Sequence, residues 1–433
     1  MKNRKKINLI TLGCSKNLVD SEFLIKQFEA SGYKVEHNSK NIQGGIVVIN
    51  TCGFIGDAKE ESVNTILTFT DAKKRGKIEK LFVMGCLSER YFNQLNTEIP
   101  EVDKIYGKFN WKDLISDLRL QYRLDLQNER TLTTPNHYAY LKISEGCSRT
   151  CAYCAIPLIT GKHKSRTIES LVDETKRLAA KGVKELQLIA QDLSFYGIDI
   201  YRKRTLSKLV SQLSEIEQIE WIRLHYAYPT GFPTEILDLM NRNQKICKYL
   251  DMALQHISDP ILKEMKRKIT KLQTYNLIQK IRDKVPDIHI RTSLITGYPN
   301  ETEKDFEQLV RFVEDIRFER LGVFTYSHEE DTYAWRYQKD NVPQKVKQQR
   351  ADYIMELQRN ISWQLNEKKI NSVFKTIIDR KEGDFYIGRT EFDSPEVDPE
   401  VLIKSESSLK IGSFYEIKII EADDYDLYGV VIK

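Results

Sequence analysis

The chain has 433 residues, of which 41% are hydrophobic and 30% charged, so its composition is that of an ordinary folded protein with two to three domains. Intrinsic disorder, collagen and small disulfide scaffolds are excluded, and a net charge of +5 is too weak to indicate a nucleic-acid partner by itself. No apolar run is long enough to span a membrane, and the stretch after the basic start Met1–Lys6 is too short for a signal peptide. We therefore expect a cytoplasmic protein without membrane contact, whose seven cysteines are free thiols or metal ligands.

The first segment, residues 1–135, combines short apolar runs with helical patterns at 20–31 and 57–75. Three of its apolar runs lead into a cysteine: 7–13 into Cys14, 46–51 into Cys52 and 81–85 into Cys86. As parallel strands, these runs end at one edge, where open α/β sheets bind their ligands. The pattern predicts a parallel α/β domain with three thiols at that edge, which form either a three-cysteine cluster site or ordinary buried core residues.

A polar stretch at 125–136 links this domain to a second segment, residues 137–368, in which strands and amphipathic helices alternate. The strand candidates are 138–143, 185–190, 220–226, 249–255, 287–295 and 321–326. Six strand–helix units predict a partial (β/α)6 barrel of the TIM type rather than a complete barrel with eight units.

The loop after the first of these strands carries the spacing CxxxCxxC, formed by Cys147, Cys151 and Cys154. Three thiolates within eight residues favour a 4Fe–4S cluster, in which one iron keeps no protein ligand and can bind a small molecule. A zinc site completed by His163 is the alternative, since structural zinc takes four ligands, and an incidental grouping is a third. Cys247 stands alone and is typical of a small core residue.

The last segment, residues 369–433, contains five short strand patterns that predict a small antiparallel barrel of the OB type. From 371 to 433 there are eight Lys or Arg and fourteen Asp or Glu, a net charge of −6. An acidic barrel favours a basic protein partner over nucleic acid, although its charge could also have no electrostatic role. The carboxylates expected to dock such a partner include Glu391, Asp393, Glu396 and Asp398.

Three features of the chain resemble the methylthiotransferase family of radical S-adenosylmethionine enzymes. They are the N-terminal Leu12-Gly13-Cys14-Ser15-Lys16-Asn17 with Asn50-Thr51-Cys52-Gly53 and Gly85-Cys86, the loop from Ser144-Glu145-Gly146-Cys147 to Cys154-Ala155-Ile156-Pro157, and a C-terminal barrel of the TRAM type. The resemblance implies an N-terminal iron–sulfur domain, a radical S-adenosylmethionine core and a TRAM-type substrate-recognition domain. It also favours the cluster interpretation of the three N-terminal cysteines.

The resemblance further implies two 4Fe–4S clusters. S-adenosylmethionine would chelate the open iron at Cys147, Cys151 and Cys154, an external donor would reduce that cluster, and the resulting deoxyadenosyl radical would attack an unactivated carbon. The cluster at Cys14, Cys52 and Cys86 would carry the sulfur, and a second S-adenosylmethionine would supply the methyl group. The residues expected to contact S-adenosylmethionine are Tyr153, Gln191, Thr296 and Gly297. Packing explains them equally well, on the barrel rim for Tyr153 and at the strand ends for the others.

Stretches such as Cys86-Leu87-Ser88-Glu89-Arg90-Tyr91 and Gly388-Arg389-Thr390-Glu391-Phe392 resemble the branch that methylthiolates the β-carbon of an aspartate in small-subunit ribosomal protein number twelve. The tRNA-modifying branch is the alternative, which the acidic terminal barrel disfavours, and a non-catalytic iron–sulfur carrier is a more distant one. Asn300 and Asp331 stand where glycine is common in the family, so the local turns there are in question.

Overall fold

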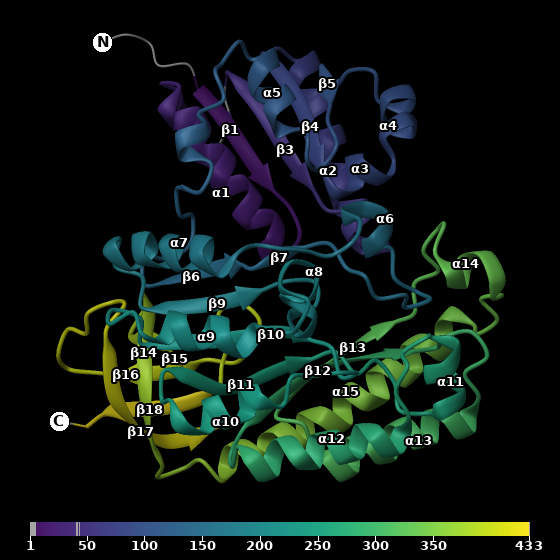
Figure 1. Cartoon of the computed structure of the whole chain (residues 1–433), viewed down its shortest axis with the longest axis vertical. Helices are drawn as coiled ribbons and strands as arrows, with labels where there is room; N and C mark the ends of the chain where they lie inside the picture. Colours follow the sequence, from purple (N-terminus) through teal and green to yellow (C-terminus); the bar gives the residue numbers. More distant parts are fainter. Residues whose placement is uncertain (1–5, 40–41, 43, 433) are drawn as a thin grey trace.

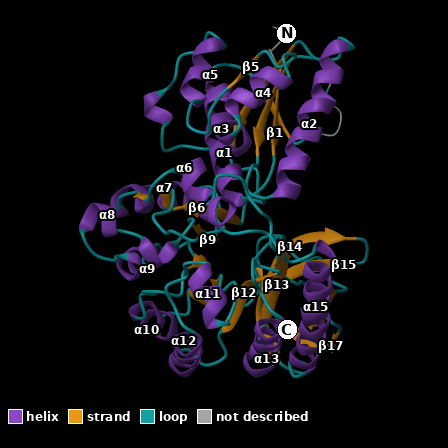
Figure 2. Cartoon of the chain, turned by 90° about the vertical axis from the view of Figure 1, so that its right-hand side faces the viewer, coloured by secondary structure: helices purple, strands orange, loops and turns teal. Residues whose placement is uncertain are grey.

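The computed structural model describes residues 6–39, 42 and 44–432, so the basic start Met1–Lys6 lies almost entirely outside the described residues. An N-terminal α/β unit stands over a central α/β sheet, and a small barrel, yellow in Figure 1, packs beside β6 and β9 of that sheet. Figure 2 shows the same stacking of the two α/β units after a 90° turn. Within the described part of the chain, no helix is both long and apolar enough to cross a bilayer.

The N-terminal unit is a parallel sheet with the strand order β2-β1-β3-β4-β5. Its strands are β1 (Lys6–Thr11), β2 (Lys34–His37), β3 (Ile46–Thr51), β4 (Lys80–Gly85) and β5 (Lys104–Ile105). Its helices are α1 (Ser15–Ala30), α2 (Gly56–Lys74), α3 (Cys86–Arg90), α4 (Phe92–Glu98) and α5 (Trp111–Asp117), followed by the short η1 (Leu124–Leu126). The three predicted cysteine-bearing strands are all present and adjacent, because each run is apolar on both faces and buried between helices.

Helix α1 begins five residues earlier than the predicted segment 20–31, directly after Cys14. The sequence signal is missing there because the first turn is polar. Asn17 is nevertheless buried, since its amide bonds the backbone of neighbouring strand ends instead of water.

The central unit is a sheet of six parallel strands in the order β13-β12-β11-β10-β9-β6, with β6 and β13 at its edges. The strands are β6 (Tyr138–Lys142), β9 (Glu185–Ile189), β10 (Trp221–Ala227), β11 (Ile246–Met252), β12 (His289–Thr296) and β13 (Arg320–Thr325). The main helices are α7 (Ile168–Ala180), α9 (Leu206–Ser214), α10 (Glu235–Arg242), α12 (Lys271–Lys284), α13 (Glu303–Ile316) and α15 (Gln344–Glu367). Shorter elements are β7 (Ser144–Glu145), α6 (Ile156–Thr160), β8 (Lys164–Ser165), η2 (Leu193–Phe195), α8 (Ile198–Tyr201), α11 (Asp259–Glu264) and α14 (Tyr333–Tyr337). This is the predicted partial barrel.

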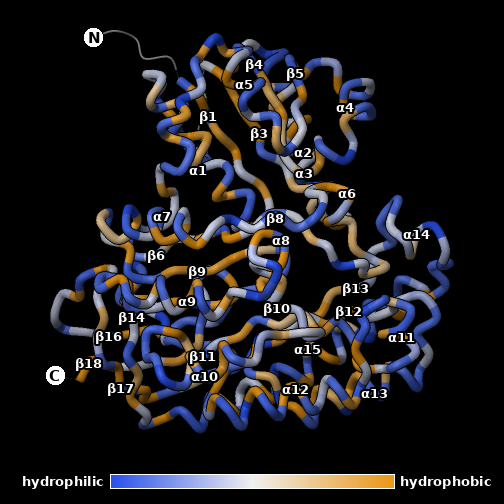
Figure 3. The backbone as a smooth tube through the Cα atoms, viewed as in Figure 1, coloured by the Kyte–Doolittle hydropathy of each residue, from blue (hydrophilic) through white to orange (hydrophobic). Residues whose placement is uncertain are grey.

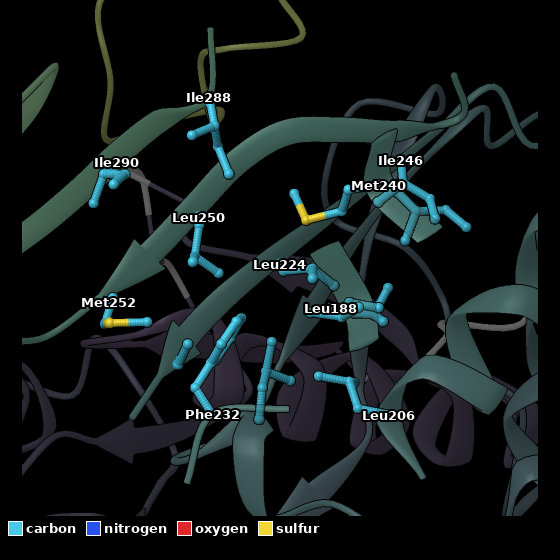
Figure 4. Close-up of a cluster of buried hydrophobic side chains, with 14 of the residues drawn as sticks. Leu188, Leu206, Leu224, Phe232, Met240, Ile246, Leu250, Met252, Ile288 and Ile290 are labelled. Atoms are coloured by element: carbon cyan, nitrogen blue, oxygen red, sulfur yellow. The ribbon is translucent and has the colours of Figure 1, made fainter. Parts of the chain in front are cut away.

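The two faces of the central strands differ in chemistry because side chains alternate along a strand. Leu188, Leu224 and Leu250 lie in the largest hydrophobic core, between the sheet and its helices (Figure 4). Figure 3 shows apolar stretches along strands such as β1 and β9, with hydrophilic residues on the outer helices. The alternate positions carry polar groups such as Gln187 and Asp251, and we call this inner face the lumen.

The C-terminal unit is a closed barrel in the order β14-β15-β16-β18-β17. Its strands are β14 (Val373–Glu382), β15 (Phe385–Thr390), β16 (Val401–Lys404), β17 (Phe414–Ala422) and β18 (Leu427–Val431), close to the five predicted strands. The barrel closes through one parallel pair, β16 with β18, while the other four pairs are antiparallel. Closure leaves no free sheet edge, which protects such a short chain segment from edge-to-edge association.

Asn300 and Asp331, two positions at which the family resemblance leads us to expect glycine, adopt a backbone conformation that glycine favours. The backbone φ is 66° at Asn300 and 61° at Asp331, both in the left-handed region. Asn and Asp tolerate this region better than other non-glycine residues. The turns at these positions therefore keep a glycine-like geometry.

Candidate functional site

Three cysteines lie at the carboxyl edge of the N-terminal sheet, as predicted. Cys14 precedes α1, Cys52 follows β3 and Cys86 opens α3. The carboxyl ends of β1 and β3 point toward the central sheet (Figure 1), so this edge faces the junction between the two units.

Glycines beside these cysteines let the strand ends approach closely. A Cβ on Gly53 would lie 2.6 Å from the Cα of Leu87, and a Cβ on Gly85 would lie 2.5 Å from the carbonyl oxygen of Thr51. Neither distance is tolerable for backbone atoms, and Gly85 also has a φ of 110°. The glycine beside each cysteine is therefore part of what assembles the thiol edge.

Buried amides cross-link the same edge. The amide of Asn17 donates to the carbonyls of Leu12 and Thr51 at 3.1 and 2.9 Å, and the amide of Asn50 donates to the carbonyl of Asn17 at 3.1 Å. The thiol of Cys86 lies 3.5 Å from the side-chain oxygen of Asn17. Such satisfied buried polar groups fix one geometry for the loop and strand ends.

The three thiols differ in how readily they ionise. Protein packed around Cys14 raises its pKa, but the charge of Lys16, with smaller contributions such as that of Lys108, outweighs this and lowers the pKa overall. Burial raises the pKa of Cys52, and it raises the pKa of Cys86 to about 12. Cys14 also raises both of these values, so the thiols are close enough to influence one another.

The CxxxCxxC loop lies between β7 and α6, at the carboxyl edge of the central sheet. It is held by backbone bonds from Cys147 to Gly161 at 3.0 Å and from Ala152 to Met265 at 3.0 Å. The backbone N–H of Arg149 points at the sulfur of Cys147, 3.4 Å away. The loop is thus anchored at several points, and its thiols come from one short segment.

A cationic and aromatic cluster, Arg149, Arg267 and Tyr228, borders the loop. Arg267 lies 3.6 Å from the sulfur of Cys151 and 3.3 Å from the hydroxyl of Tyr153. The guanidinium groups of Arg149 and Arg267 lie 4.0 and 4.1 Å from the centre of the Tyr228 ring. Positive charge at this distance favours thiolates over thiols.

The loop thiols nevertheless resist ionisation in the protein alone. Burial raises the pKa of Cys147 to about 11, and burial raises the pKa of Cys154 well above its usual range. Cys151 adds to both shifts, because neighbouring thiolates repel each other. Three thiols in this arrangement become good ligands when a multivalent cation compensates their charge.

The four residues expected to contact S-adenosylmethionine have different surroundings. Tyr153 packs at the loop with its ring 6.5 Å from that of Tyr298, and the amide of Gln191 donates to Glu145 at 2.7 Å while its oxygen finds no partner within the described chain. The hydroxyl of Thr296 donates to the carbonyl of Lys347 at 3.1 Å, and the N–H of Gly297 donates to Glu301 at 2.9 Å. Of these four residues, only Tyr153 and Gln191 thus keep a polar atom that can still form a hydrogen bond with a ligand in the lumen.

A chain of buried charges joins the two thiol sites. Lys108 pairs with Asp20 of α1 at 2.8 Å, Asp20 also contacts Lys142 of β6, and Lys142 pairs with Glu145 at 2.8 Å. Glu145 in turn accepts the bond from Gln191. Burial opposes the charge of Glu145, but Lys142 and Lys108 lower its pKa to about 2. The N-terminal unit is therefore tied electrostatically to the carboxyl edge of the central sheet.

His163, the fourth ligand that the zinc alternative needs, lies beside the loop, and its Nδ1 has no hydrogen-bond partner among the described residues. Within the described ranges, no three His, Cys, Asp or Glu side chains are grouped in the way that holds a single metal ion. The Nε2 of His163 lies 3.0 Å from the hydroxyl of Ser165, and its ring packs against Phe195. Cys247 is fully buried beside Trp221, as expected of a core residue.

The four carboxylates expected to dock a basic partner are bonded to groups of this chain, and one of them, Asp393, is buried. They are Glu391, Asp393, Glu396 and Asp398. These carboxylates lie in the loop 391–400 between β15 and β16, which packs against the amino-terminal side of the lumen. Their partners belong to this chain: the N–H of Lys248 bonds Glu391 at 3.1 Å, Arg320 pairs with Asp393 at 2.6 Å, Tyr138 and Tyr140 donate to Glu396 at 3.1 Å, and Tyr249 donates to Asp398 at 2.7 Å. Arg320 therefore neutralises the charge of Asp393 within the chain, and Arg291 does so for Asp398.

Sequence reasoning did not assign roles to Lys16, Arg149, Arg267 or Tyr228. Lys16 stands inside the motif that carried the family resemblance, so a signal existed for it. Arg267 and Tyr228 follow other strands, far from the CxxxCxxC loop in sequence, and only the fold brings them to the thiols.

Three family models match the chain: an uncharacterized protein family, UPF0004, at residues 6–107, the radical SAM superfamily at 141–313 and the TRAM domain at 370–432. Among solved structures, the radical S-adenosylmethionine methyltransferase TsrM from Kitasatospora setae superposes with a TM-score of 0.55 at 13% identity, over 74% of this chain and 72% of that one. The cobalamin-dependent S-adenosylmethionine radical enzyme OxsB gives a TM-score of 0.52 at 14% identity, over 77% and 55% of the two chains. At such identities the likeness concerns the fold alone.

Curated relatives are far more similar. Proteins named ribosomal protein uS12 methylthiotransferase RimO are 58% identical over 429 residues in Parabacteroides distasonis, covering 99% of both chains, and 58% identical over 431 residues in Porphyromonas gingivalis, again covering 99% of both. The relative of the same name in Christiangramia forsetii is 56% identical, over 98% of this chain and 94% of its own. The chain therefore belongs to the RimO family of ribosomal protein uS12 methylthiotransferases, a radical S-adenosylmethionine enzyme family with a TRAM domain.

Proposed function

We propose that this protein is a radical S-adenosylmethionine methylthiotransferase that adds a methylthio group to the β-carbon of an aspartate in ribosomal protein uS12. The observation that carries the proposal is the pairing of two three-thiol sites, Cys14/Cys52/Cys86 and Cys147/Cys151/Cys154, at facing edges of two sheets. Family membership indicates which reaction takes place. The two thiol sites allow its two tasks, cleavage of S-adenosylmethionine and insertion of sulfur, to be carried out at separate places.

We propose that each triplet holds one 4Fe–4S cluster. Each site offers three thiols, one fewer than the four ligands that a structural zinc ion usually takes. A cluster fits better, because its irons bind the thiolates at separate corners and leave one iron open. At the CxxxCxxC site, such a cluster supplies the electron that cleaves S-adenosylmethionine and so starts the removal of a hydrogen atom.

The residues of this chain then have distinct tasks. Arg267 lies against the sulfur of Cys151 and against Tyr153, so it lends positive charge to the loop and fixes the tyrosine beside it. Gln191, held by Glu145, presents an oxygen to S-adenosylmethionine at the end of β9. The proposed contacts through Thr296 and Gly297 are limited to shape, because their polar groups already have partners.

The loop 391–400 closes the opposite side of the lumen. Its bonds to tyrosines of β6 and β11 keep bulk water away from the amino-terminal side, and a reactive radical requires such exclusion. The TRAM-type barrel thereby completes the site, and its exposed carboxylates remain available for a basic ribosomal protein. They are Glu382, Asp384, Glu406, Glu416, Glu421 and Asp423. We place the reaction in the cytoplasm, with an external electron donor.

Mass spectrometry of ribosomal proteins and tRNA from a strain that lacks the gene tests the function. We expect uS12 from that strain to lack one methylthio group, with the tRNA unchanged, and expression of the gene to restore the group. Loss of a tRNA methylthio group with intact uS12 would instead assign the chain to the tRNA-modifying alternative.

A further inference from the structure

The side chain of Lys16 crosses from the N-terminal unit to the central sheet. Lys16 lies two residues after Cys14, in the first turn of α1. Its ammonium nitrogen lies 3.6 Å from the centre of the Tyr226 ring, near the end of β10. The charge of Lys16 is therefore located between the N-terminal thiol edge and the lumen.

The backbone at Tyr226 is strained. Its φ is 63°, in the left-handed region that bulky residues rarely adopt. Such strain persists only where surrounding structure enforces it, and it concentrates at sites that bind ligands. The strained turn presents the ring on which Lys16 rests.

Lys16 differs from three other cations near the lumen, Lys108, Lys142 and Arg291, each of which has a carboxylate partner. Lys108 pairs with Asp20, and Lys142 pairs with Asp20 and Glu145. Arg291 pairs with Asp251 and Asp398 at 3.6 and 3.2 Å. Arg267 has no carboxylate partner among the described residues, but its guanidinium already contacts Cys151, Tyr153 and the carbonyl of Ala253. Throughout residues 6–39, 42 and 44–432, Lys16 forms no ion pair, and its contact is the aromatic ring. A cation held by a ring keeps the N–H donors that do not face the ring for an incoming anion.

We propose that Lys16 binds the side-chain carboxylate of the substrate aspartate and so holds its β-carbon between the two thiol sites. This inference rests on the proposed function. The carboxylate is bonded directly to the β-carbon that reacts. A contact to the carboxylate therefore restricts the position of that carbon more than a contact to the peptide backbone does. The carboxylate of S-adenosylmethionine is a poorer candidate, because the CxxxCxxC loop has its own cation, Arg267, which lies 3.6 Å from the sulfur of Cys151.

Binding of two uS12 peptides tests the inference. One peptide carries the reactive aspartate and the other carries asparagine in its place. With the reconstituted parent protein, fluorescence anisotropy should give about 10- to 100-fold tighter binding of the aspartate peptide, as expected when a hydrogen bond to a charged group is lost. Lys16→Gln should bind both peptides with the weak affinity of the asparagine peptide, and Lys16→Arg should retain part of the preference.

Lys112→Gln is the matched control, because Lys112 also lies over an aromatic ring, Tyr122, at 4.9 Å, but is exposed. It should keep the parent's preference. A Lys16→Gln protein with the same preference as the parent would overturn the inference. So would loss of iron from both Lys16 variants, which would assign the lysine to the thiol site. If the parent protein modifies no uS12 peptide, the proposed function itself is contradicted. That result differs from both outcomes that would overturn the role of Lys16.

Discussion

The two thiol sites are assembled in different ways. Cys147, Cys151 and Cys154 lie within one loop between β7 and α6, so one short segment brings them together. Cys14, Cys52 and Cys86 come from three strand–helix junctions and meet only when the parallel sheet has formed. A local site tolerates disturbance of the sheet, whereas a non-local site depends on every close approach within it.

The largest expected effect comes from removing either triplet. Anaerobically reconstituted parent protein should contain about eight irons, and a variant with Cys147, Cys151 and Cys154 all changed to alanine should contain about half of that. The variant lacking Cys14, Cys52 and Cys86 should also keep about half. Iron assays and visible absorption check this. A triple variant that keeps all its iron, or a parent that binds one zinc, would contradict two clusters.

Adding one methyl group at Gly53 should disturb the N-terminal thiol site and leave the CxxxCxxC site intact. Gly53→Ala places a Cβ against the backbone of Leu87, so we expect it to lower iron binding toward the half content of the N-terminal triple variant. Gly56→Ala is the control, because a Cβ there meets only Ser327 at 3.7 Å. Equal iron in both variants would show that the thiol edge does not need the close approach at Gly53.

The joint between the two α/β units should contribute strongly to stability. Arg130 is buried, contacts Glu22 of α1 and pairs with Glu174 of α7 at 2.9 Å. Arg130→Ala leaves these two buried carboxylates without their shared partner, so the free energy of unfolding should fall by about 3–5 kcal/mol. Urea denaturation of the apoprotein measures it. A loss below about 1 kcal/mol, comparable to an exposed ion pair, would mean that the joint is not a rigid support of the site.

Acid should weaken the contact between the terminal barrel and the central unit. Burial raises the pKa of Asp379, but Arg389 outweighs this and holds it at about 2, below the ordinary value of 3.8. A depressed carboxyl pKa stabilises the fold above the ordinary value, and the stabilisation is lost as the pH falls from about 4 to about 2. Between pH 6 and pH 2, the apoprotein should lose about 2 kcal/mol more than Asp379→Asn does. If the free energy of unfolding falls equally with pH in the parent and in Asp379→Asn, this prediction is contradicted.

Much of the architecture could be predicted because its signals are local. The six central strands are short stretches in which apolar residues recur at alternate positions, and the CxxxCxxC spacing is visible in eight consecutive residues. The contacts between units could not be predicted in this way. Asp393 and Asp398 belong to a net acidic segment, and nothing in that segment shows that Arg320 and Arg291 neutralise them. Lys16 likewise sits in a recognisable motif, while its partner Tyr226 lies on a distant strand.

Product analysis with a uS12 peptide, S-adenosylmethionine and a reductant tests the division of labour between the two sites most directly. The parent should form both 5′-deoxyadenosine and the methylthiolated peptide. Cys52→Ala, purified with its CxxxCxxC cluster intact, should still form 5′-deoxyadenosine but no methylthiolated peptide, and the Cys147/Cys151/Cys154 variant should form neither. Methylthiolated peptide from Cys52→Ala, or loss of 5′-deoxyadenosine in that folded variant, would contradict separate roles for the two thiol sites.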